Sequence, residues 1–111
     1  MLKKEYRLRK KKDIDLVFKE GSKSFYNDFL GIKSLKNNKE YSRLVVIISA
    51  KVSKKSVNRN KMKRRVKYFF INNKKEIASG FDFVITVKKD FSQEKYSKIE
   101  IFLTQAFKEV V

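Results

Sequence analysis

The sequence predicts an α+β fold, a sandwich in which helices pack on one sheet. Three segments carry apolar residues at helical spacing. The segments between them alternate apolar and polar residues or run through β-branched ones. The chain has 111 residues, 41% hydrophobic and 14% aromatic, which is enough to build one core. We therefore expect a single domain over residues 1–111, with elements in the order α-β-β-α-β-α.

The first predicted helix covers residues 13–20, with Asp13 as a candidate N-cap and Gly21 as a stop signal. Three apolar residues share one face by their spacing and a fourth points the other way; these are Ile14, Val17 and Phe18, and then Leu16. Two interpretations stay open. The helix is sandwiched in the core, or it packs one face and offers the other to a ligand.

Two strands are predicted next. Residues 23–35 read as one strand, in which Phe29 and Ile32 face opposite sides. At most one of the two can therefore belong to a binding cleft, unless a bulge intervenes. After a polar turn at 36–39, the β-branched run 42–50 is typical of a central strand buried on both sides.

A long basic helix is predicted over residues 56–75. Its apolar stripe is narrow and consists of Met62, Val66, Phe69 and Phe70. Polar and basic residues cover the rest of its circumference. One flank of the helical wheel carries Asn60, Lys63, Arg64 and Lys67, and the other carries Lys61 and Arg65.

The last two predicted elements are a strand and a helix. Residues 81–87 alternate apolar and polar side chains, as expected of a strand. Ser92 is a candidate cap for a helix that runs to about Glu109. No linker, repeat or second domain is apparent.

Positive charge is concentrated in two segments. The formal net charge is +17, of which residues 1–12 carry +6 and residues 51–67 carry +9. We treat residues 1–12 as a basic N-terminal arm. Such a concentration is typical of a surface that binds a polyanion.

Several catalytic and targeting features are missing from the sequence. The chain has no Cys and no His, and its three Gly form no phosphate-binding motif. We therefore expect a binding protein, with no catalytic residue and no dedicated metal site of its own. The basic start has no apolar segment behind it and no apolar run approaches ~20 residues, so we expect a soluble protein of the cytoplasm.

Nucleic acid is the polyanion that fits best. A membrane-surface helix needs a wide apolar face, which the basic helix lacks, so we expect no membrane partner. Basic residues beside aromatic ones suit phosphate contacts and base stacking. An enzyme-associated RNA binder, a structural RNA-binding protein such as a small ribosomal protein, and a DNA-compacting protein all remain open.

Two motifs resemble one known family. The run Arg59-Asn60-Lys61-Met62-Lys63-Arg64 opens the basic helix, with Lys61 where that family has Arg or Lys. Residues 7–21, which read RLRKKKDIDLVFKEG, are similar to the same family's N-terminal opening. A G-x-D-hydrophobic strand follows from Gly80. On these motifs the chain resembles the protein component of bacterial ribonuclease P.

The resemblance implies both a fold and a function. The fold is a mainly four-stranded sheet packed with three helices, including a left-handed β-α-β crossover. A catalytic RNA with its own Mg²⁺ cleaves precursor tRNA to form the mature 5′ end, and the protein binds no cofactor itself. The expected partners are that RNA and precursor tRNA, with one protein monomer per RNA.

The resemblance also implies roles for particular residues. Docking on the catalytic RNA is assigned to Arg59, Asn60, Lys61, Lys63, Arg64 and Lys67. A cleft between the first helix and the sheet is expected to hold the single-stranded 5′ leader. The residues assigned to the leader are Arg7, Arg9, Ile14, Phe18, Phe29, Ile32 and Lys51.

Overall fold

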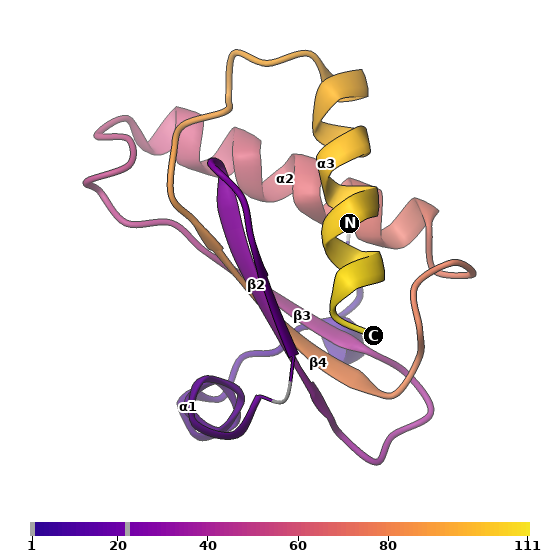
Figure 1. Ribbon diagram of the computed structural model, residues 1–111. Coiled ribbons are helices and arrows are strands. Elements are labelled where there is room, and N and C mark those ends of the chain that lie inside the picture. The colour runs from indigo at the N-terminus through magenta and orange to yellow at the C-terminus, as the bar shows by residue number, and fades with distance from the viewer. Residues whose placement is uncertain (1, 22) are drawn as a thin grey trace.

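The computed structural model describes residues 2–21 and 23–111 (Figure 1). A short 3-10 helix, η1 (Lys4–Tyr6), precedes seven longer elements in this part of the chain. These are α1 (Lys11–Glu20), β1 (Lys23–Tyr26), β2 (Leu30–Lys36), β3 (Arg43–Ile47), α2 (Ser56–Asn72), β4 (Phe81–Val87) and α3 (Tyr96–Glu109).

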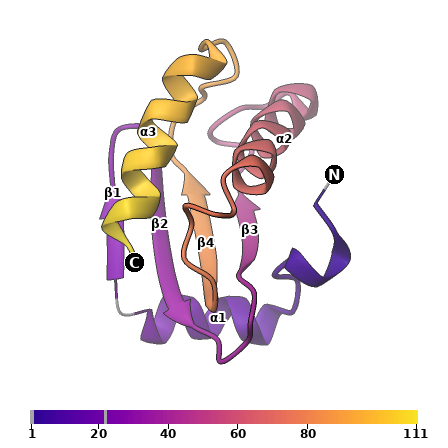
Figure 2. The ribbon, with the colours of Figure 1, turned by 90° about the vertical axis from the view of Figure 1, so that its right-hand side faces the viewer.

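The strands form one mixed sheet in the order β1-β2-β4-β3. The β1–β2 and β2–β4 pairs are antiparallel, and β3 runs parallel to β4. In Figure 2, β3 and β4 both point upward, α2 lies in front of them and β4 lies to the left of β3. The β3-α2-β4 crossover is therefore left-handed, the opposite of the usual hand.

Helices cover both faces of the sheet, with α2 and α3 on one face and α1 on the other (Figures 1 and 2). The larger apolar cluster lies under α2 and α3 and includes Ile32, Phe83 and Ile85, all fully buried. The smaller cluster lies under α1 and joins Val17 to Val84. The expected fold class, helices packed around one sheet, is confirmed.

The segment 23–35 forms two strands where the sequence predicted one. Asn27 ends β1, and its side-chain oxygen accepts hydrogen bonds from the backbone N–H groups of Phe29 and Leu30, both at 2.9 Å. The backbone N–H of Asn27 also donates to the carbonyl of Leu30 at 3.0 Å. An asparagine that binds the backbone two and three residues ahead closes a tight turn. The resulting hairpin supplies the fourth strand.

Two other expectations are corrected. The strand at 42–50 is an edge strand, β3, with only alternate side chains buried. Leu8 of the N-terminal arm lies along it, because its N–H donates to the carbonyl of Leu44 at 2.9 Å. The last helix begins at Tyr96 and not at Ser92, since the N–H of Ser92 binds Asp90 Oδ1 at 2.8 Å in a turn before the helix.

Candidate RNA-binding site

The basic helix α2 buries the stripe that its sequence predicts: Met62, Val66, Phe69 and Phe70. Residues that carry positive charge project from the two sides of this stripe, as the helical wheel indicates. One flank faces the N-terminal arm and the other faces the loop that precedes α3.

The flank toward the α3 loop is engaged in contacts within the protein. Arg65 Nη1 donates to the carbonyl of Glu94 at 2.6 Å. Hydrogen bonds from Ser92 lower the pKa of Asp90, and the charge of Lys61 adds to this effect. Arg59 also makes a contact within the protein, because its Nη1 donates to the carbonyl of Ser53, in the segment before the helix, at 2.7 Å. Arg59 and Arg65 therefore hold the segments before α2 and before α3 against the helix.

The other flank meets the arm and forms a cluster of cations. Burial lowers the pKa of Lys67, and the nearby charges of Arg7 and Lys63 lower it further. Within residues 2–21 and 23–111, no carboxylate forms an ion pair with any of these three. We call the group on this side the docking surface; it consists of Arg7, Asn60, Lys63, Arg64 and Lys67.

Arg9 lies on the arm beside a shallow basic groove. The groove has a volume of 370 Å³ and shares Arg7 with the docking surface. Its walls come from the arm, from Tyr41 and from β3. The residues that line it are Lys4, Glu5, Arg7, Arg9, Lys10, Tyr41 and Arg43.

The α1 face of the sheet carries a second group of polar and aromatic side chains. The strand register puts Lys33 opposite Val84, and both Gly31 and Ile47 opposite Thr86. Val84 packs against α1, so the side chains of this register lie on the α1 side. We call the less covered part of this side the open sheet face; it consists of Tyr26, Lys33, Ile47, Thr86 and Lys88.

Contacts within the open sheet face position an aromatic ring. Tyr26 lies over Gly31, where a Cβ atom would come within 2.6 Å of the ring. Lys88 Nζ lies 4.3 Å from the centre of the same ring. Lys33 Nζ donates to the carbonyl of Phe18 at 3.2 Å, which ties the end of α1 to the sheet.

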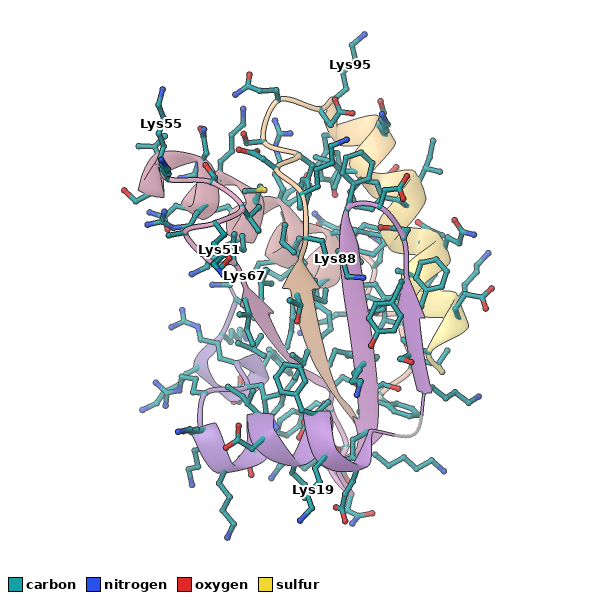
Figure 3. All side chains as sticks on the ribbon, turned by 60° about the vertical axis from the view of Figure 1, so that its left-hand side comes forward. Lys19, Lys51, Lys55, Lys67, Lys88 and Lys95 are labelled. Carbon is teal, nitrogen blue, oxygen red and sulfur yellow. The ribbon has the colours of Figure 1, made fainter. Side chains whose placement is uncertain are left out.

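Figure 3 looks onto this side of the molecule. Helix α1 crosses the lower end of the sheet, and Lys88 lies over the strands above it. Lys51 and Lys67 lie to the left of the strands. Lys51 is exposed in the segment between β3 and α2, so it can reach a ligand that approaches from this side.

The structure divides the residues assigned to the 5′ leader. Phe18, 44% exposed, lies at the end of α1 beside the open sheet face. Ile14 is half-buried against the smaller core cluster. Ile32 is fully buried under α2 and α3. Phe29 lies in the hairpin turn and stacks on Phe102 at 5.1 Å.

Neither Phe29 nor Ile32 therefore lies in a cleft beside α1, which corrects the expected placement. The prediction that Phe29 and Ile32 face opposite sides of one strand was wrong, because β2 begins only at Leu30 and Phe29 lies in the turn before it. The ring of Phe29 instead packs against Phe102 of α3.

Sequence reasoning missed four exposed or half-exposed residues, namely Tyr26, Lys33, Tyr68 and Lys88. Lys33 is a charged residue in the middle of a strand with buried neighbours, and this was an available signal. Tyr26 could not be placed without the hairpin. Tyr68 lies off the apolar stripe of its helix, at 58% exposure, and an unburied aromatic residue in a basic helix was also an available signal.

Metal and membrane features are absent from the part of the chain that the structure describes. Within residues 2–21 and 23–111, no group of three or more His, Cys, Asp or Glu side chains is arranged to hold a metal ion. In the same residues no helix is long and apolar enough to cross a bilayer.

A mixed sheet with a left-handed crossover, two cationic surfaces and a net charge of +17 define a small basic α+β protein that binds polyanions. The family model described as Ribonuclease P matches residues 2–111. The chain belongs to the ribonuclease P protein family. It is the protein subunit of the ribonucleoprotein that processes the 5′ end of tRNA, and proteins of this family work with the ribonuclease P RNA.

Individual relatives agree with this assignment. The ribonuclease P protein component of Thermotoga maritima is 42% identical over 88 residues, covering 79% of this chain and 74% of the relative. That of Streptococcus pneumoniae strain Hungary19A-6 is 32% identical over 107 residues, covering 96% and 85%.

A solved structure of the RNase P protein from Thermotoga maritima, in complex with 1-(4-fluorophenyl)-2-thiourea, has a TM-score of 0.85 at 36% identity. The match covers 95% of this chain and 100% of that one. These comparisons support the ribonuclease P assignment over a structural ribosomal protein.

Proposed function

We propose that the two surfaces bind two different RNAs. The docking surface binds the ribonuclease P RNA, and the open sheet face with Phe18 binds the single-stranded 5′ leader of precursor tRNA. The observation that carries the proposal is the separation of the surfaces: α2 and the arm build one, and the sheet and α1 build the other.

The docking surface suits a folded RNA backbone. Its charged members are lysines and arginines that no carboxylate neutralises within the described residues, and such side chains bind phosphates without reading sequence. Arg59 supports this surface indirectly, since its hydrogen bond to the carbonyl of Ser53 stabilises the segment that precedes α2.

The open sheet face suits an unpaired strand. Tyr26 and Phe18 are 54% and 44% exposed, and Lys88 and Lys33 lie directly beside them. Aromatic rings stack on bases of any sequence while lysines follow the backbone, which is how proteins hold single strands. Leaders differ in sequence between tRNAs, so recognition without sequence preference fits this role.

The chemistry belongs to the RNA in this proposal. The chain has no His or Cys, and Mg²⁺ held by the RNA would activate the attacking water and stabilise the transition state. The protein's part is electrostatic, because two polyanions must approach each other and a cationic protein replaces the counterions that would otherwise be needed. One protein molecule binds one RNA, and the complex works in the cytoplasm.

The test is cleavage of a 5′-extended precursor tRNA by a bacterial ribonuclease P RNA transcript at low Mg²⁺. We expect release of the leader only when the protein is added, and a smaller gain for a substrate with a one-nucleotide leader. A poly-lysine peptide of equal total charge serves as the control for charge alone.

Two results would refute the proposal. One is no gain from the protein, although the RNA alone is active at high Mg²⁺. The other is an equal gain from poly-lysine. The mass of the complex, measured by light scattering, tests the 1:1 composition.

A further inference from the structure

A groove of 460 Å³ lies between the N-terminal arm and α2. One wall comes from the arm and the other from three successive turns of the helix. Its lining is partly apolar and partly cationic, and consists of Leu2, Arg7, Arg64, Lys67, Tyr68 and Ile71.

Three cations converge on this groove without a counter-charge. Arg7 is held in place because its Nε donates to the carbonyl of Leu2 at 2.9 Å, which leaves its terminal nitrogens available. Arg64 and Lys67 are three residues apart on α2 and so share one face. None of the three takes part in an ion pair within the described residues. Like charges gathered this closely are stabilised when an anion binds.

An aromatic ring lies among these cations. Tyr68 follows Lys67 and is 58% exposed. An edge-to-face contact with Tyr96 of α3, 5.4 Å between ring centres, supports the ring. Leu2 and Ile71 add apolar walls to the same groove. A supported, exposed ring beside cations is a suitable platform for a nucleobase.

The ring and the apolar walls of this groove indicate a ligand that offers an apolar surface in addition to a phosphate group. A duplex presents its backbone and keeps its base faces stacked, so it would leave Tyr68 and the apolar walls in contact with water. An unpaired nucleotide supplies a phosphate and a free base face together, and proteins that recognise RNA commonly bind bases that lie outside the stack. An acidic peptide would match the cations but needs no aromatic platform.

We infer that this groove binds one unpaired nucleotide of the ribonuclease P RNA, with its base on Tyr68 and its phosphates on Arg7, Arg64 and Lys67. The inference rests on the proposed function of the docking surface and adds a specific nucleotide contact to it. Arg7 would then bind the ribonuclease P RNA and not the 5′ leader.

The experiment measures the Kd of the full-length protein for a bacterial ribonuclease P RNA transcript at several salt concentrations. Loss of one base stack predicts that Tyr68→Ala weakens binding roughly 5- to 100-fold. Tyr68→Phe keeps the platform and retains the affinity. Ile101→Ala removes an exposed apolar side chain from α3 (71% exposed, against 58% for Tyr68) and serves as the matched control.

Salt dependence separates the two kinds of contact. Tyr68→Ala leaves the slope of log Kd against log salt unchanged, whereas Arg7→Gln flattens it by about one ion. Acylation of RNA 2′-hydroxyl groups provides a second readout. One nucleotide changes reactivity when wild type or Tyr68→Phe binds, and does not change with Tyr68→Ala.

The proposed nucleotide is refuted if Tyr68→Ala binds as tightly as Ile101→Ala, or if Tyr68→Phe loses as much affinity as Tyr68→Ala. Tyr68→Leu, which keeps an apolar contact with Tyr96, replaces Tyr68→Ala if the latter does not fold. Cleavage of precursor tRNA by the wild type is measured alongside. A wild type that stimulates cleavage while these variants bind normally refutes only the nucleotide contact, whereas a wild type without stimulation refutes the proposed function.

Discussion

Arg43 and Asp82 form a two-pronged ion pair across the parallel β3–β4 pairing, in which the two residues are register partners. Arg43 Nε and Nη2 donate to the two carboxylate oxygens of Asp82 at 2.8 and 2.6 Å. Arg43 Nη1 also lies 3.5 Å from Asp13 of α1. The pair therefore joins the edge strand, the central strand and the helix that borders the open sheet face.

Breaking this pair is expected to destabilise the fold. The side chains are 17% and 7% exposed, so Asp82→Asn leaves a largely buried guanidinium with only the more distant Asp13 as a charged partner. The expected loss is about 2–4 kcal/mol in the free energy of unfolding. Urea unfolding checks it, with Asp15→Asn on the exposed side of α1 as the control. Equal midpoints for the two variants would show that the pair adds nothing to stability.

Local pattern and the family resemblance were enough to predict the layers of the fold and the cationic flank of α2. The stripe at Met62 and Val66 is regular, and a helix that buries one stripe has to expose its other sides. The hairpin was harder, since Asn27 lies inside an alternating segment and acts through its own side chain. A turn without Gly or Pro gives only a weak sequence signal.

The two surfaces could not be predicted completely, because they depend on contacts between distant segments. Arg7 meets Lys67 only because the arm runs along β3. Tyr26 meets Lys88 only because β1 folds back on β2 and brings the ring over Gly31. Periodicity assigns a residue to a face, and tertiary structure decides which residues of other elements lie beside it.

Arg64→Ala is expected to weaken binding of ribonuclease P RNA and to reduce its dependence on salt. Arg64 is exposed on the docking surface, so its loss costs little stability but releases about one counterion fewer on binding. The measurement is the slope of log Kd against log salt. Lys108→Ala, at the exposed end of α3, is the matched control and keeps the wild-type slope. Equal slopes for Arg64→Ala and wild type would remove Arg64 from the interface.

Arg7→Gln is expected to raise the pKa of Lys67 toward its ordinary value of 10.5. Burial is the main cause of the lowered pKa and remains, but the charge of Arg7 is the next cause. Because the pKa is lower in the folded state, protonated Lys67 opposes folding at all pH values below that pKa. This effect fades as pH rises through it toward 10.5.

The measurement is a titration of the Lys67 side chain by NMR. Its midpoint moves to higher pH in Arg7→Gln and stays unchanged in Lys95→Gln, which removes an exposed charge next to α3. Bound RNA is expected to raise the midpoint as well, since phosphates favour the protonated amine. An equal Lys67 midpoint in Arg7→Gln and wild type would show that Arg7 does not influence Lys67. The arm would then not belong to the docking surface.

Phe18→Ala is expected to weaken binding of precursor tRNA more than binding of mature tRNA. The ring is 44% exposed and Val17 beside it is fully buried, so the core survives while a base-stacking surface is lost. Removal of one stack predicts a roughly 5- to 100-fold weaker precursor complex. The Kd of the assembled holoenzyme for both tRNAs is the measurement, and Leu16→Ala, 43% exposed on the same helix, is the control. Equal losses for both tRNAs would assign Phe18 to the fold alone, and the leader would then lie over Tyr26 without touching α1.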